Sequence, residues 1–112
     1  MTEHDLLKHV STVTGVAMNR IVKQPGERPT KRVECDARAL TVLAGRSLWP
    51  TVRPSHLGEF LGLSQSGSIL ALERGNRLFK EDKSFRRLAK LLFAELVLYL
   101  HTKRNLDTPP RR

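Results

Sequence analysis

Apolar residues recur every three or four positions along most of this chain, which is the spacing of amphipathic α-helices. The first such stretch predicts a helix over residues 2–13 that ends at Gly15, and residues 17–22 add one or two further turns. Residues 23–31 break the pattern with two prolines and several cations, which indicates a loop. The pattern resumes over residues 33–46, where we expect another helix.

The second half of the chain predicts three more helices. Residues 54–61 form a short helix with proline in its first turn, and a tight turn follows. Ser64 is a good N-cap for a helix over residues 65–74, which Gly75 should close. Asp82 is a second N-cap, and the apolar spacing after it predicts a long helix to about residue 103.

Together these segments predict an all-α fold, a compact helical bundle of about six helices with a long C-terminal helix. A length of 112 residues suits one domain with one modest core. We assign residues 1–103 to that single domain and expect residues 104–112 to be a flexible basic tail.

Residues 54–77 have the features of a helix-turn-helix, since two short helices flank a glycine-containing turn. The small Gly58 would let the second helix pack closely on the first. The apolar residues expected to hold the two helices together are Leu57, Leu61, Leu63, Ile69 and Leu72. In such a motif the second helix enters the major groove, so its outward side chains reach base edges. The alternative is a plain helical hairpin inside a bundle, with no role in DNA binding.

The polar residues near the start of the second helix are the expected base readers. They are Gln65, Ser66 and Ser68. Glutamine bonds adenine through two atoms at once, and serine bonds several base edges. A helix N-terminus also offers free N–H groups to a phosphate, which places Ser64 beside the backbone of a duplex.

The charge of the chain agrees with a nucleic-acid partner. The formal net charge is +9, and the pI is near 10.6. A basic surface also attracts RNA, anionic lipid and acidic proteins, so charge alone does not choose the partner. The cations expected to contact DNA phosphates lie in the basic loop and after the start of the second motif helix: Arg28, Lys31, Arg32, Arg74, Arg77 and Lys80.

Several classes of function are disfavoured. Cys35 is the only cysteine, so the chain has no internal disulfide and no site built from several thiolates. The four histidines are dispersed without metal-ligand spacing, and no paired carboxylates or nucleophile triad stands out. No apolar run has the length of a membrane span. We expect a cytoplasmic, non-enzymatic protein without metal or cofactor.

The motif residues also resemble a known family. Leu57-Gly58, Leu61-Gly62 and Ile69-Leu70, at their spacing, are similar to the C-terminal DNA-binding domain of the bacterial replication initiator DnaA. The eleven positions from Gly58 to Ile69 match that family and exceed by one the interval of phage-repressor motifs. The similarity extends over about residues 6–92.

This resemblance implies a nucleoid-associated protein that acts in or regulates the initiation of chromosomal replication. It also implies that an arginine or lysine of the basic loop enters the minor groove, either Arg28, Lys31 or Arg32.

Two alternatives follow from where the chain departs from the family. The family begins its recognition helix with Asp-His-Thr-Thr-Val, whereas residues 65–69 read Gln-Ser-Gly-Ser-Ile. One alternative is a protein adaptor that binds the replicative helicase or the initiator. The other is a small transcription regulator that binds an unrelated operator. The last predicted helix is apolar around more of its circumference than a single core-facing stripe needs. We therefore expect its far side to contact another chain or a second copy.

Overall fold

The computed structural model describes the backbone of residues 1–23 and 31–107 and the side chains of these residues up to 102. Six α-helices follow one another, and the described residues form no β-strand. The helices are α1 (Glu3–Thr14), α2 (Met18–Ile21), α3 (Arg32–Leu48), α4 (Pro54–Phe60), α5 (Gln65–Glu81) and α6 (Lys83–Asp107). The predicted all-α bundle of about six helices is confirmed.

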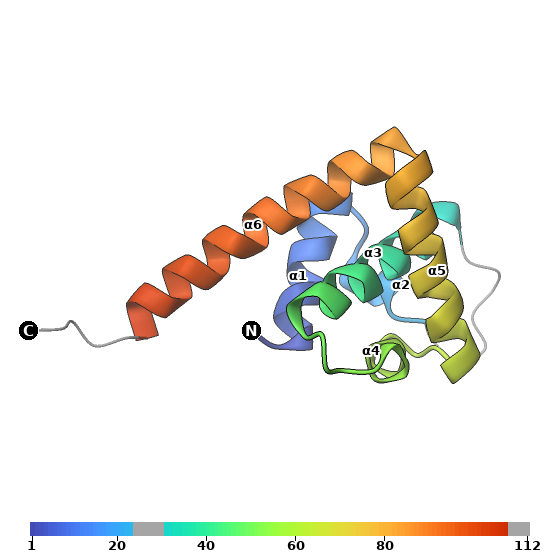
Figure 1. The fold of residues 1–112 in the computed structure, drawn as a ribbon, viewed down its shortest axis with the longest axis horizontal. Helices are drawn as coiled ribbons and strands as arrows, with labels where there is room; N and C mark the ends of the chain where they lie inside the picture. The colour runs from blue at the N-terminus through green and yellow to red at the C-terminus, as the bar shows by residue number, and fades with distance from the viewer. Residues whose placement is uncertain (24–30, 108–112) are drawn as a thin grey trace, which may run out of the picture.

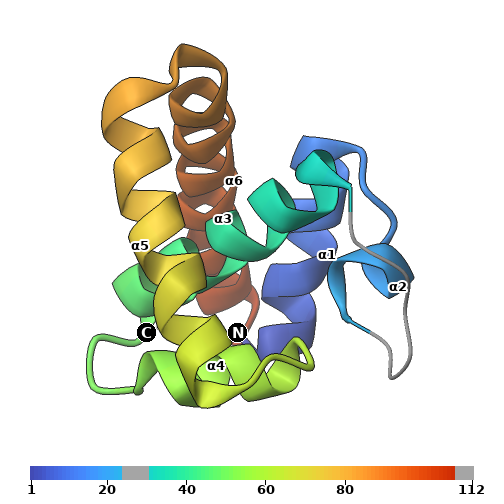
Figure 2. The ribbon, with the colours of Figure 1, turned by 90° about the vertical axis from the view of Figure 1, so that its right-hand side faces the viewer.

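Helix α3 lies at the centre and packs between α1 and α5 (Figures 1 and 2). Ala37, Leu40 and Ala44 on α3 are buried, and short side chains here let its neighbours approach closely. Helix α4 lies at the base of α5, and α6 crosses α1 and α5 before its C-terminal end projects away from the other helices (Figure 1). The two ends of α5 therefore lie far apart, one beside α4 and the other beside the start of α6.

Local sequence signals set several helix ends as predicted. Gly15 adopts φ +74° and terminates α1, a backbone conformation that residues with a Cβ rarely adopt. The Oγ of Ser64 accepts a hydrogen bond from Gly67 N at 3.0 Å, so Ser64 is the N-cap of α5. Asp82 Oδ1 accepts one from Phe85 N at 3.0 Å, which caps the start of α6.

The prediction that Gly75 closes the second motif helix is wrong, because α5 continues to Glu81. Gly75 is buried where α5 crosses α3, and a Cβ there would lie 3.0 Å from the Ala39 carbonyl oxygen. The glycine therefore serves a close helix crossing. The true end of α5 is capped by Arg86, which donates to the Phe79 carbonyl at 2.7 Å and to the Lys80 carbonyl.

The C-terminal boundary also differs from the prediction. Helix α6 ends at Asp107, about one turn beyond the expected residue 103. Residues 104–107 of the predicted tail thus belong to the helix, and the remaining five, 108–112, lie outside the described residues.

Helices α4 and α5 are joined by a short turn and pack against each other. Gly62 in the turn has φ +76°, and the Lys23 N–H donates to the Leu61 carbonyl at 2.9 Å, which ties the segment after α2 to this turn. Gly58 of α4 faces Ser68 of α5, where a Cβ on Gly58 would lie 1.6 Å from the Ser68 Oγ and 2.4 Å from its Cβ. Such contact leaves room only for glycine.

Most of the expected apolar contacts of the motif are present. Leu57 and Leu61 are buried, and Leu63 and Leu72 pack against the core half-buried. Ile69 is the exception, because 46% of its surface is exposed. The prediction that Ile69 holds the two helices together is therefore wrong, and Ser68 takes that place.

Gly58→Ala tests the close contact between α4 and α5. We expect it to destabilise the domain by about 1–3 kcal/mol, since the new methyl group forces α4 and α5 apart. That loss corresponds to roughly 4–8 °C in Tm for each kcal/mol in a domain of this size. Thermal unfolding followed by circular dichroism at 222 nm measures it.

Gly67→Ala is the matched control, because its Cβ would meet only the Ser64 Oγ at 3.1 Å and the Leu63 Cβ at 3.7 Å. The same glycine-to-alanine change should here keep or raise Tm, since alanine favours helix by up to about 1 kcal/mol. Equal Tm changes in the two variants would contradict the packing described above.

Candidate nucleic-acid interface

The side of α5 that faces away from the core is exposed near the start of the helix. Its core side carries Ser68, Gly75 and Leu78, all buried. A helix turns by 3.6 residues, so the opposite side collects residues about two positions away from these. Apart from Asn76 and Lys80, the exposed side chains on or beside it are Gln65, Ser66, Ile69, Leu70, Glu73 and Arg77. We call these six residues the outer face of α5.

Two of the three predicted base readers lie on or beside this face. Gln65 and Ser66 are exposed in the first turn of α5. Ser68 is fully buried, and its Oγ donates to the Ser64 carbonyl at 2.7 Å. The prediction that Ser68 reads bases is wrong, because its small side chain fills the gap above Gly58.

The sequence analysis did not identify Ile69, Leu70 or Glu73 as residues of the outer face. Leu70 is 63% exposed and Ile69 is 46% exposed, so Leu70 is the more exposed of the two. The residues in contact across the motif, Gly58 and Ser68, are ten positions apart, which is the phage-repressor interval. A contact ten positions after Gly58, and not eleven, would have predicted that Ser68 faces α4 and that Ile69 and Leu70 lie on the outer face of α5.

Cations lie on and near the outer face. On α5, Arg77 and Lys80 are exposed, and on the start of α3, Lys31 and Arg32 are exposed. Arg32 lies 3.9 Å from Asp36 and 3.8 Å from Asp82, at the outer limit of an ion pair, so its guanidinium remains available to a phosphate. The predicted phosphate ligand Arg28 lies outside the described residues.

Two predicted phosphate ligands are already engaged within the protein. Arg74 donates from Nε and Nη2 to one carboxylate oxygen of Asp36, at 3.0 and 2.8 Å. This pair ties α5 to α3, so Arg74 acts first as a structural residue. The Ser64 hydroxyl is used as the N-cap of α5, although the residue itself is exposed.

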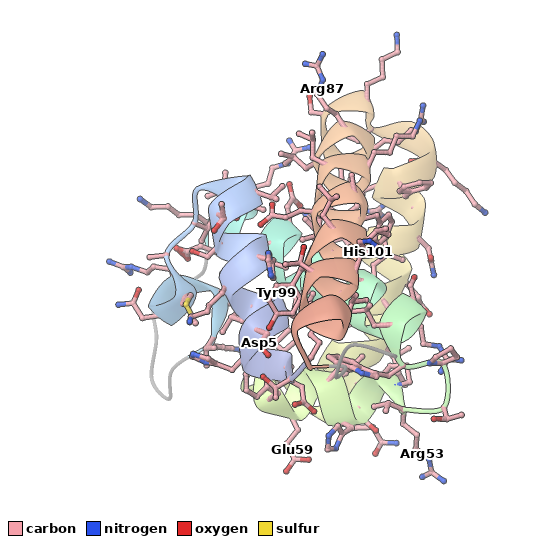
Figure 3. All side chains as sticks on the ribbon, turned by 90° about the vertical axis from the view of Figure 1, so that its left-hand side faces the viewer. Asp5, Arg53, Glu59, Arg87, Tyr99 and His101 are labelled. Atoms are coloured by element: carbon pink, nitrogen blue, oxygen red, sulfur yellow. The ribbon has the colours of Figure 1, made fainter. Side chains whose placement is uncertain are left out.

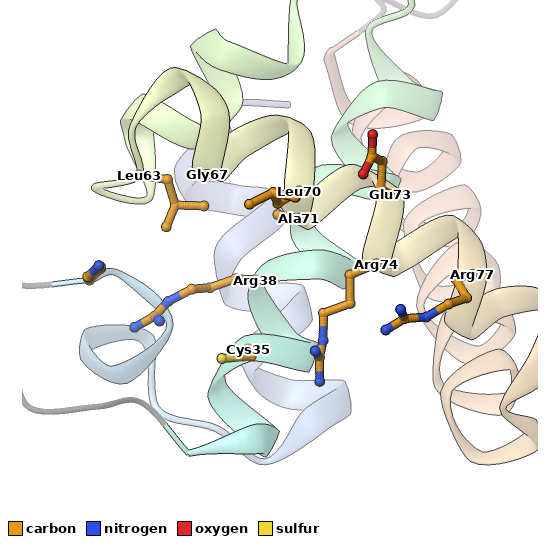
Figure 4. Close-up of a pocket in the computed structure, with 10 residues that line it drawn as sticks. Cys35, Arg38, Leu63, Gly67, Leu70, Ala71, Glu73, Arg74 and Arg77 are labelled. Atoms are coloured by element: carbon orange, nitrogen blue, oxygen red, sulfur yellow. The ribbon is translucent and has the colours of Figure 1, made fainter.

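A groove of about 580 Å³ runs beside the outer face, between α5 and the start of α3 (Figure 4). Arg38 lies at its base, buried, and donates to the Ile21 carbonyl at 2.6 Å and to the Arg20 carbonyl at 3.1 Å. Leu70 and Leu63 supply apolar walls. The cations that line it are Lys23, Arg38, Arg74 and Arg77. Glu73 also lines the groove, which therefore has an excess of cations over carboxylates, and Leu70, Glu73 and Arg77 belong both to it and to the outer face.

Further cations follow at the start of α6, directly after Asp82, whose carboxylate lies 3.8 Å from Arg32. Lys83, Arg87 and Lys90 are exposed at the start of α6, and Arg87 points outward there, far from Glu59 of α4 (Figure 3). The group is therefore separated from Gln65 and Ser66 by the length of α5. It does not extend the surface around the start of α5.

The far side of α6 is apolar and exposed. Leu91, Val97 and Leu98 have more than half of their surfaces exposed, with Leu98 at 67%. The opposite side is fixed to α1, where His9 bonds Glu95 and its ring meets Tyr99 edge-on at 4.8 Å between centroids. Among the described residues, no helix combines the length and hydrophobicity that crossing a membrane requires.

The different roles of Arg74 and Arg77 give a direct test. Arg74→Ala should lower the free energy of unfolding by about 1 kcal/mol, because it leaves Asp36 without its hydrogen-bond donor. Arg77→Ala removes an exposed side chain and should change it by less than about 0.5 kcal/mol. Urea unfolding of both variants measures the difference, and a larger loss for Arg77→Ala would refute the assignment.

Comparison with known proteins identifies no family. No protein-family model, no curated protein and no solved structure matches the chain significantly.

Proposed function

We propose that this chain is a non-enzymatic protein that binds double-stranded DNA by inserting α5 into the major groove. The observation that carries the proposal is the exposed outer face of α5, held by a helix-turn-helix and bordered by a cationic groove. An α-helix with its side chains is about 10–12 Å across, and the major groove of B-DNA is about 12 Å wide.

The distribution of charge supports the same partner. Lys31 and Arg32 are exposed at the start of α3, Arg77 lines the groove between α3 and α5, and Lys80 is exposed one turn farther along α5. Phosphates border the major groove, so cations beside a helix seated there are in a position to contact them. Gln65 and Ser66, in the first turn of α5, are the base readers in this arrangement.

The process that this binding serves is proposed from the resemblance to the DnaA domain. It is the initiation or regulation of chromosomal replication, on the nucleoid. The contact between Gly58 and Ser68, at the phage-repressor interval, favours instead a small transcription regulator at an unrelated operator. Both functions use the same surface of α5.

The alternative from another class is a protein adaptor that binds the replicative helicase or the initiator. The observation that favours it is the exposed apolar side of α6, with Leu91, Val97 and Leu98. A second copy of this chain is another candidate partner for that surface, and a symmetric dimer would present two α5 helices to a palindromic site.

Salt dependence tests the proposed DNA contacts. We expect affinity for duplex DNA to fall linearly with salt on a double-logarithmic plot, and each lost phosphate contact to reduce the slope by about 0.9. Arg77→Ala and Lys80→Ala should each cause that reduction. Fluorescence anisotropy with a labelled duplex between 50 and 200 mM salt, the range over which such affinities change most visibly, is the measurement.

Lys8→Ala is the control, since Lys8 is exposed on α1 and its loss changes the net charge equally. It should leave the slope unchanged. If Lys8→Ala reduced the slope as much as Arg77→Ala, binding would be an effect of overall charge. If no duplex bound at low salt, DNA binding would be excluded and the adaptor function favoured.

A further inference from the structure

Two aliphatic side chains occupy the middle of the outer face of α5. Ile69 and Leu70 are adjacent in sequence and exposed, with polar residues one turn before them and Glu73 one turn after. Isolated exposed aliphatic residues are common on protein surfaces and need no explanation. This pair differs because it lies where the proposed function places the bases.

The pair contributes little to holding the fold together. Neither residue belongs to the core cluster or to the apolar residues packed against it, whereas the next residues along α5, Ala71 and Leu72, do pack there. Leu70 forms part of the wall of the cationic groove, with Arg74 and Arg77 farther along the same wall. The pair is therefore an apolar spot with cations beside it.

In the major groove, one apolar group is available to contact Ile69 and Leu70. Among the four bases only thymine presents a methyl group there, whereas the other groove edges present hydrogen-bond donors and acceptors. We propose that Leu70, with Ile69 beside it, contacts thymine 5-methyl groups, so that the protein selects sites containing thymine next to the base read by Gln65. This inference rests on the proposed binding of α5 to duplex DNA.

The neighbouring residues fit a site of this composition. Gln65, one turn nearer the start of α5, suits adenine, which a site rich in A·T pairs supplies. Glu73, one turn farther along, can accept a hydrogen bond from the amino group of adenine N6 or cytosine N4 and is repelled by the acceptor atoms of guanine. The phosphates of a duplex would neutralise the neighbouring cations. An apolar protein partner would leave those cations without a counter-charge.

Replacement of thymine by deoxyuridine tests the inference, because uracil keeps every hydrogen-bonding group and loses only the methyl. A duplex is first recovered from a random-sequence pool with the full chain, and is then synthesised with thymine or with deoxyuridine. We expect the deoxyuridine form to bind about fourfold more weakly for each methyl group that is contacted.

Leu70→Ala should bring the ratio of the two affinities close to one while the variant still binds both duplexes. The variant should fold, since the side chain is exposed and alanine has the highest helix propensity. Leu100→Ala on α6 is the control, because Leu100 is an exposed leucine away from α5 that has no part in the proposed contacts, and it should keep the full ratio.

The outcomes separate the inference from the function on which it rests. Equal binding of both duplexes by the unaltered protein overturns the methyl contact and leaves DNA binding intact. A full ratio retained by Leu70→Ala overturns the assignment to Leu70. Failure to recover any duplex overturns the proposed function itself, and with it this inference.

Discussion

The contact between Gly58 and Ser68 is the constraint on which the rest of the site depends. A Cβ on Gly58 would overlap the Ser68 side chain, so α4 and α5 approach as closely as their backbones allow. Gly75 repeats this arrangement farther along α5, against the Ala39 carbonyl of α3. Two close contacts on one side of a helix fix its rotation about its own axis. That rotation turns Ser68 inward and directs Leu70 and Glu73 toward solvent.

The excess of positive charge has two uses in this structure. Some arginines hold the fold together: Arg38 binds carbonyls of α2, Arg86 caps α5, and Arg74 joins α5 to Asp36 of α3. Others remain exposed around α5, where Arg77 and Lys80 accompany the cations at the start of α3. The net charge of +9 therefore overstates the charge that is available to a partner near the proposed DNA site.

The sequence predicted those features that depend on neighbouring residues. Helix caps are of this kind, since Gly15, Ser64 and Asp82 act within one turn of their own helix. Gly75 was misread because its partner, Ala39, is remote in the sequence, and a glycine at a crossing resembles one at a helix end. The pairing of Arg74 with Asp36, 38 positions away, was hidden for the same reason.

The orientation of α5 illustrates a different limit. Residues 69–72 are four aliphatic side chains in succession, so their pattern does not show which of them face the core. Only the packing partners of Ser68 and Gly75 settle it. Of the expected base readers, Gln65 and Ser66 in the first turn are exposed as predicted, whereas Ser68 is buried, because the rotation of the helix first matters there.

The proposed DNA binding requires that the outer face of α5 contact the duplex. Titration of the ¹⁵N-labelled protein with a duplex, followed by amide chemical shifts, tests this requirement. The largest shift changes should fall on residues 65–73 and on the start of α3, with little change in the second half of α6. Changes confined to α6 around Leu98, with residues 65–73 unaffected, would contradict it.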